Sequence, residues 1–344
     1  MVYGVLKFIN FAHGDVYMVG AYIGLFATTG IFLHSSPLLQ GIGGIALSMI
    51  GCALLGVFIE RLAYRPLRNG VGVRDTVPWS LFWSLYVGLF GGKVLQHSLH
   101  ISAWEGFGLA AIIGYVLIYP GVRFLFRLLQ GKVRPSNSRL TALITAIGIS
   151  LLLENQGEAI FGVNPQAHQI AGFNGGAKLG IGSLSVRISV GQLSVLVSAV
   201  ILTIILVYIV RYTRIGRAIR AVSYDPEAAA LMGIPTDRII AFTFIIGSAM
   251  AGAAGFLNHM LTHLQFDTNI GITLGLKAFV AAVLGGIGSI EGAVLGAILM
   301  GIAETFTGGS SLSSFQQAVA FVILIGVLLF RPSGLLGRNT IEKV

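Results

Sequence analysis

The stretch RYTRIGRAIRAVSYDPEAAALMGIPTDR (Arg211–Arg238) is polar and basic, and it separates two long apolar runs, Val190–Val210 and Ile239–Leu261. Asp225 can cap a helix whose first residue is a proline, a residue that suits this position. The residues that follow are good helix formers, and Gly233 then ends the helix after about two turns. The sequence therefore predicts a short capped helix in a loop between two longer helices.

The composition points to a membrane protein. Of 344 residues, 55% are hydrophobic and only 10% are charged, too few charges to cover the surface of a soluble domain of this size. A β-barrel would show short alternating segments instead of long apolar runs. The 47 glycines suit closely packed membrane helices, where small residues let backbones approach. We expect an all-α, polytopic transmembrane helical bundle that forms a single domain over residues 1–344.

Nine apolar runs are candidates for helices that cross the membrane, because about 20 residues span the hydrocarbon core. They are Val16–Leu33, Leu38–Ile59, Val77–Leu95, Phe107–Leu125, Leu140–Phe161, Val190–Val210, Ile239–Leu261, Leu274–Phe306 and Phe315–Phe330.

Basic residues indicate which loops face the cytoplasm. Of the 22 Lys and Arg residues, 17 fall in four clusters, within residues 61–74, 123–139, 211–238 and 331–343. The positive-inside rule places these clusters in the cytoplasm, so 211–238 is a cytoplasmic loop. The net charge of +9 therefore reports topology and contact with anionic membrane lipid, and not a nucleic-acid partner.

This assignment makes one apolar run cross the membrane twice. The polar segments Gly162–Ser189 and Thr262–Thr273 fall outside, and a single crossing by Leu274–Phe306 would leave the basic C-terminal tail outside as well. We therefore expect this run to enter and return as two shorter helices, joined near the membrane interior by GGIGSIEG (Gly285–Gly292). Broken backbone at that depth is tolerated where it faces protein or a water-filled cavity.

The segment INFAHGDVYMVGAY (Ile9–Tyr22) carries a second interruption between apolar flanks. Polar groups in such a place are costly unless they cap helices or line a path. Two interrupted segments in corresponding halves suggest a possible inverted repeat with a translocation path between them. The candidate path residues are Asn10, His13, Gly14, Gly285, Gly286, Gly288, Ser289 and Glu291.

Three charged residues have simpler interpretations. We expect Asp15 to cap the helix after Gly14, and Glu291 to cap the helix after the glycine-rich turn. Lys277 lies near the outer entry and can reach the interface with its long side chain.

The chain lacks the motifs of the common enzyme classes. It has no GxxxxGK[ST] loop, so we expect it not to hydrolyse ATP, and no HExxH or GxSxG pattern. The single Cys52 excludes an intramolecular disulfide and a cysteine-based metal cluster. We expect no enzymatic activity, no metal site and no cofactor.

Several motifs together resemble a known family. INFAHGDVYMVGAY, ERLAYRPLR, TALITAIGISLLLEN, DPEAAALMGIPTDR, KAFVAAVLGGIGSIEGAVLGAILMGIAE and RPSGLLGRNTIEKV are similar to segments of the LivH-type permease of branched-chain amino-acid ABC importers. The resemblance implies a bacterial inner-membrane subunit that works with a second, LivM-like permease, two cytoplasmic ABC ATPases and a periplasmic solute-binding protein. It assigns coupling to an ATPase to Asp225, Glu227, Ala228, Ala229 and Gly233.

The chain departs from that family in two places, and two other functions remain open. It begins close to INFAHG, where family members carry about one more hydrophobic helix, so its start is trimmed or the first helix is a remnant. Residues 76–135 resemble an insertion with two extra spans, which face lipid or offer a further partner surface. The alternatives are a same-family permease for urea or short amides, and an ion-coupled secondary transporter, which would require paired carboxylates in mid-membrane.

Overall fold

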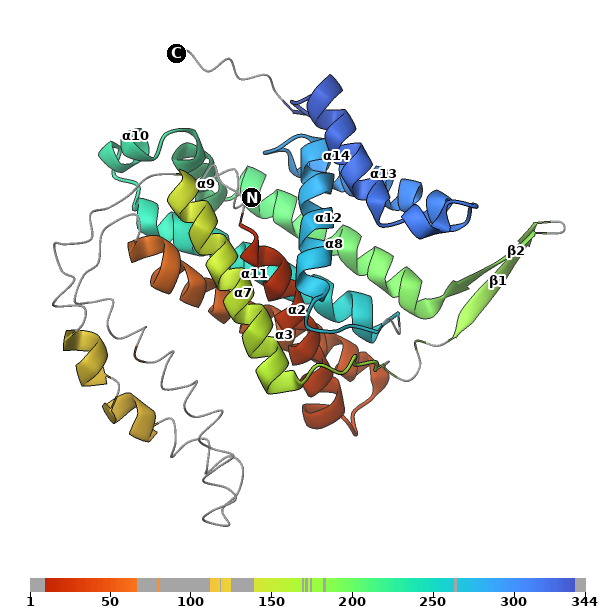
Figure 1. Ribbon diagram of the computed structural model, residues 1–344, viewed down its shortest axis with the longest axis horizontal. Helices are drawn as coiled ribbons and strands as arrows, with labels where there is room; N and C mark the ends of the chain where they lie inside the picture. The colour runs from red at the N-terminus through yellow and green to blue at the C-terminus, as the bar shows by residue number, and fades with distance from the viewer. Residues whose placement is uncertain are drawn as a thin grey trace, which may run out of the picture.

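The computed structural model describes residues 10–66, 80, 112–117, 119–124, 139–168, 170, 173, 175–181, 184–262 and 265–337. Helices dominate this part of the chain, which confirms the predicted fold class (Figure 1). The elements are α2 (Ala12–Phe26), the π-helical turn η1 (Ala27–Ile31), α3 (Pro37–Ile59), the π-helical turn η2 (Glu60–Tyr64), α7 (Arg139–Phe161), β1 (Gly176–Ile181), β2 (Leu184–Ser189), α8 (Val190–Tyr212), α9 (Arg214–Tyr224), α10 (Pro226–Leu231), α11 (Thr236–Met260), α12 (Ile270–Gly285), α13 (Ile290–Gly308), the 3₁₀ turn η4 (Ser313–Phe315) and α14 (Ala318–Phe330).

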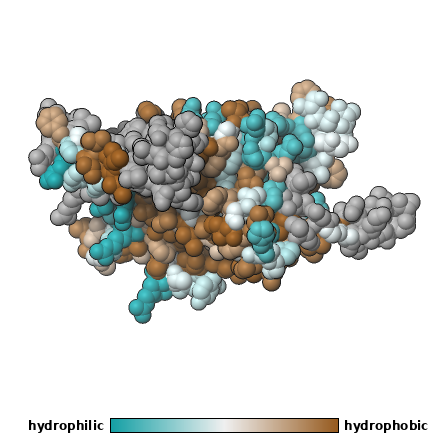
Figure 2. All heavy atoms as spheres, turned by 90° about the horizontal axis from the view of Figure 1, so that it is seen from below, coloured by the Kyte–Doolittle hydropathy of each residue, from teal (hydrophilic) through white to brown (hydrophobic). Residues whose placement is uncertain are grey.

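Several helices have the length and composition of membrane spans. In the described residues four are long and apolar enough to cross a bilayer, namely Pro37–Tyr64, Val190–Tyr212, Thr236–Met260 and Ile290–Gly308. Figure 2 shows apolar atoms over much of one face, as a lipid-facing surface requires. The predicted run Val77–Leu95, apart from Ser80, and most of the predicted insertion at 76–135 lie outside the described residues.

The helices α2, α3 and α11 form the centre of the bundle through small residues. The backbones of Gly20 on α2 and Gly252 on α11 approach so closely that a Cβ on Gly20 would lie 2.5 Å from the Cα of Gly252. The Ser48 hydroxyl on α3 donates to the Gly20 carbonyl at 3.0 Å. Large side chains such as Phe244 and Phe256 then fill the space beside these crossings. Close backbone approach explains the abundance of glycine in this chain.

The two helices predicted over Leu274–Phe306 are present as α12 and α13, joined by a short turn. The backbones of Gly285 and Gly292 meet beside the turn, where a side chain on either residue would overlap the other. Gly286 and Gly288 have φ angles of +105° and +97°, which favour glycine because they lie in the left-handed half of the map.

The predicted depth of this turn is wrong. The backbone N–H groups of Leu335 and Leu336 donate to the carbonyls of Leu284 and Gly285 at 2.8 and 2.9 Å. The turn therefore packs against the segment after α14, which begins the basic C-terminal cluster. Under the positive-inside assignment it lies at the cytoplasmic end of the bundle and not near the membrane interior.

The predicted outer loop Gly162–Ser189 contains a β-hairpin that the sequence analysis missed. Strand β1 pairs antiparallel with β2, with Gly176 opposite Ser189 and Ile181 opposite Leu184. In Figure 1 the hairpin extends away from the helices. At its end a capping box begins α8, because the Ser189 hydroxyl accepts from the Gln192 N–H while the Gln192 side chain accepts from the Ser189 N–H, both at 3.1 Å.

Candidate functional site

The short helix predicted in the 211–238 loop is α10, and its start is capped as expected. The Asp225 carboxylate accepts hydrogen bonds from the N–H groups of Glu227 and Ala228, each at 2.9 Å. Pro226 takes the first helical position. The negative charges of Asp225 and Glu227 also lie at the positive end of the helix dipole. This helix is therefore well defined despite its six residues.

The end of α10 is fixed by the predicted glycine. Gly233 has a φ of +81°, its N–H donates to the Ala230 carbonyl, and the N–H of Ile234 donates to the Ala229 carbonyl, both at 3.0 Å. These two bonds form a Schellman motif. The next helix, α11, begins without such a cap, because Pro235 occupies the cap position without a side-chain bond and Thr236 is already helical.

The residues in and around α10 fall into a buried group and an exposed group. Ala229 is buried in the core cluster that includes Ile219 and Val222 of α9. Tyr224, Leu231 and Met232 are 87%, 89% and 83% exposed. Large apolar side chains held in water at the tip of a polar loop are typical of a contact surface for another protein. We call these three residues the α10 tip.

The α10 tip was not among the residues predicted from the sequence. The three residues could have been found as the large apolar residues in a loop that is otherwise polar and basic. Of the predicted coupling residues, Asp225, Glu227, Ala228 and Gly233 are exposed, whereas Ala229 is buried and instead anchors α10 to α9.

A cavity of about 410 Å³ lies between α2, α8, α9, α11, α12 and the α12–α13 turn. Six of the eight candidate path residues line it, namely Asn10, His13, Gly14, Gly286, Gly288 and Ser289. The rest of the lining is largely apolar, with Phe11, Leu206, Val210, Ile219, Met250 and Phe279 among its residues. The structure thus brings together two segments that are about 270 residues apart in the sequence, whereas their role in transport remains a prediction.

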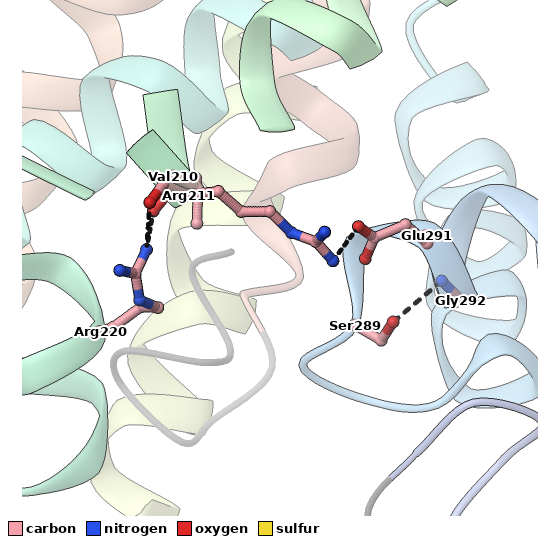
Figure 3. A network of polar contacts seen from close by, with 6 residues as sticks. All are labelled: Val210, Arg211, Arg220, Ser289, Glu291 and Gly292. Carbon is pink, nitrogen blue, oxygen red and sulfur yellow. Dashed lines mark hydrogen bonds and ion pairs between the residues drawn. The ribbon is translucent and has the colours of Figure 1, made fainter. Parts of the chain in front are cut away.

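The other two candidate path residues lie outside the cavity lining. Gly285 instead provides the close backbone contact with Gly292. The Glu291 carboxylate forms an ion pair with Arg211 at the end of α8 (Figure 3). The helix cap predicted for Glu291 belongs to Ser289, whose hydroxyl accepts from the Gly292 N–H at 3.0 Å.

Two further predictions about charged residues are wrong. Asp15 does not begin α2, which starts at Ala12; it is fully buried and accepts a hydrogen bond from the Ser150 hydroxyl of α7. Lys277 does not extend to an interface, because its ammonium group pairs with the Glu304 carboxylate of α13 at 3.0 Å. Both partners lie far away in the sequence, so spacing alone could not reveal them.

Candidate metal ligands do not gather anywhere in the part of the chain that the structure describes, where no group of three His, Cys, Asp or Glu side chains could hold an ion. Cys52 is buried, and its thiol is directed at the Val16 carbonyl with a distance of 3.4 Å. It serves the packing of α3 on α2.

This chain is similar in sequence to several known permeases. The permease protein LivH of the high-affinity branched-chain amino acid transport system of Salmonella typhimurium is 34% identical over 348 residues, covering 100% of this chain and 90% of LivH. BraD of Pseudomonas aeruginosa, with the same description, is 35% identical over 349 residues, covering 100% of this chain and 91% of BraD. The xylose/arabinose import permease XylH of Sulfolobus acidocaldarius is 26% identical over 229 residues, covering 64% of this chain and 60% of XylH. No solved structure matches the chain.

All three relatives are named as permeases, which are transport proteins and not enzymes. The family model described as "Branched-chain amino acid transport system / permease component" matches residues 1–328. A permease component implies a transport system with further subunits. This chain is therefore a multi-pass membrane protein that belongs to the branched-chain amino acid transport permease family.

Proposed function

We propose that this chain is the membrane-spanning permease subunit of an ATP-driven importer for leucine, isoleucine and valine. The observation that carries the proposal is the arrangement of α10. A capped helix holds the exposed α10 tip, and through α9 it is joined to a cavity lined by segments from both halves of the chain. The positive-inside rule supports a cytoplasmic position for this loop. Family membership and the names of LivH and BraD support the cargo.

The α10 tip suits an ATPase partner because its exposed apolar side chains belong to the same loop as the exposed charged residues Glu227 and Arg238. An apolar centre surrounded by charges is the usual composition of a protein contact. In this proposal two cytoplasmic ABC ATPases supply the energy, and one of them binds the tip. Ala229 transmits the movement because it buries α10 against α9.

The cavity suits an amino acid with an apolar side chain. Its walls carry Leu206, Met250 and Phe279, which would contact such a side chain. The polar groups of Asn10, His13 and Ser289 line the same space and could bind the charged amino and carboxylate groups. A second, LivM-like permease would complete the path, and a periplasmic solute-binding protein would deliver the cargo to this inner-membrane complex.

Two alternatives define the experiment. XylH is similar to this chain but is named as a permease for the sugars xylose and arabinose. Sequence similarity alone therefore does not determine the cargo. The structure also buries the carboxylates of Asp15 and Glu60, which an ion-coupled transporter could use. The coupling surface at α10 favours the ATP-driven mechanism.

The test is uptake of labelled leucine and labelled urea in proteoliposomes that contain this chain, the second permease, the ATPases and the binding protein. We expect ATP-dependent uptake of leucine and none of urea, and loss of uptake when the ATPase P-loop lysine is replaced. Uptake of urea alone would overturn the cargo. Uptake of leucine by this chain without any ATPase would overturn the mechanism.

A further inference from the structure

An ion pair spans the rim of the cavity on the side of the 211–238 loop. Arg211 is the penultimate residue of α8, and Glu291 lies in the first turn of α13 (Figure 3). Their side chains are 57% and 44% exposed and do not line the cavity, whereas the adjacent residues Val210 and Ile290 do. The pair thus joins two walls of the cavity, one from α8 and one from α13, at its edge.

On one side of the rim, α9 holds the end of α8. The Arg220 guanidinium of α9 donates to the Val210 carbonyl and lies 3.4 Å from the Arg211 carbonyl (Figure 3). A positive charge at these last carbonyls is favourable because the C-terminal end of a helix is negative. The backbone of Gly216 also packs directly on the Val210 carbonyl, where a Cβ would overlap it. Movement of α9 must therefore move Arg211.

On the other side of the rim, Glu291 belongs to a rigid turn. Ser289 caps α13, and the backbone contact between Gly285 and Gly292 fixes α13 against α12. The negative charge of Glu291 in the first turn is itself favourable there. The α12–α13 turn carries Gly286, Gly288 and Ser289 of the cavity lining. Movement of Glu291 must therefore move this part of the wall.

We propose that Arg211 and Glu291 form a cytoplasmic gate pair, which holds the cavity mouth narrow while joined and connects α9–α10 to the α12–α13 turn. The proposal rests on the proposed function, because it takes the cavity as part of the transport path. Neither the α12–α13 turn nor α13 follows α9 directly in the chain, so the pair supplies a connection that the backbone does not.

The strength of the pair suits a gate. Exposed ion pairs are weak, so breaking this one shifts the balance between narrow and open mouths by about two- to fivefold. A gate that opens in each transport cycle needs a contact of this size, since a buried pair would cost far more to separate.

The gate pair can be tested with a reporter for access to the cavity. Ala278 lines the cavity, and a C52S background removes the only native thiol. In this background A278C is labelled in inside-out vesicles with a membrane-impermeant maleimide. We expect R211E and E291R each to raise the labelling rate about two- to fivefold, and the double variant R211E/E291R to restore the original rate.

Two further variants keep the result decisive. R214E makes the same change of charge at an exposed arginine of α9, and we expect it to leave the labelling rate unchanged. E291Q removes the pair without adding repulsion, and we expect it to raise the rate less than E291R. The gate pair would be overturned if E291R and E291Q left the labelling rate unchanged, or if the double variant failed to restore the rate. It would also be overturned if R214E had an equal effect.

This readout does not depend on the cargo. If the wild-type complex failed to take up leucine while the labelling pattern held, the proposed function would fail and the gate pair would stand. If leucine uptake held while the charge reversals left access unchanged, the gate pair alone would fail.

Discussion

At the scale of single residues, Gly233 is the position of the 211–238 loop whose backbone conformation favours glycine. Its φ of +81° lies in the left-handed region, which costs other residues about 1–2 kcal/mol and β-branched residues more. We expect Gly233→Val to unwind the end of α10 and to lower leucine uptake about tenfold, while the protein still inserts into the membrane. Uptake and ATP hydrolysis, measured on the same proteoliposomes, check this outcome.

The matched control is Gly233→Asn, because asparagine tolerates the left-handed conformation. No atom lies within 4 Å of a Cβ built on Gly233, so the larger side chain meets no obstacle. We expect this variant to retain uptake within about twofold of the wild type. Equal loss in both variants would mean that size, and not backbone conformation, matters at this position.

Residue-level predictions from the sequence succeeded where the partner is near in the chain. Asp225 and Gly233 were identified correctly because a helix cap bonds to residues two to five positions away. The roles expected for Asp15, Lys277 and Glu291 were wrong because their partners Ser150, Glu304 and Arg211 come from other helices. Only the folded chain brings such pairs together.

At the scale of elements, the crossing of α2 and α12 depends on a glycine that also lines the cavity. A Cβ on Gly14 would overlap the Gly271 carbonyl and lie 2.8 Å from the Gly275 Cα. Backbone atoms cannot move aside as a side chain can, so we expect Gly14→Ala to destabilise the bundle by about 1–3 kcal/mol. A lower melting temperature of the purified protein in detergent would verify this.

Gly148 in α7 provides the control for this substitution. Nothing lies within 4 Å of a Cβ built there, and alanine favours a helix more than glycine does. Gly148→Ala should therefore leave the melting temperature unchanged or raise it slightly. Equal melting temperatures for Gly14→Ala and the wild type would show that the crossing is looser than described.

Elements were predictable from the sequence where a long apolar run or a count of crossings defined them. The basic segments 211–238 and 331–343 were placed on the same side of the membrane, which requires an even number of crossings between them. Leu274–Phe306 was therefore expected to form two helices, and α12 and α13 are present. The β1–β2 hairpin was missed because two six-residue strands in a polar loop leave no long periodic pattern. The depth of the Gly285–Gly292 turn was also misjudged, since it depends on contact with the chain after α14.

At the scale of the whole molecule, the positive-inside rule predicts which end of each helix faces the cytoplasm. Ser310 follows α13 and is exposed, and the parity of crossings places it outside. We expect S310C, in the C52S background, to react with an impermeant maleimide in right-side-out vesicles and not in inside-out vesicles. Labelling from the cytoplasmic side only would exclude the assigned direction of α13.

Both the ATPase contact and the gate pair require the α10 tip to lie in the cytoplasm. Tyr224 is 87% exposed and makes a suitable reporter as Y224C in the C52S background. We expect labelling by an impermeant maleimide in inside-out vesicles only, with protection when the ATPase subunits are bound. Labelling of Y224C from the outer side of intact cells would contradict it.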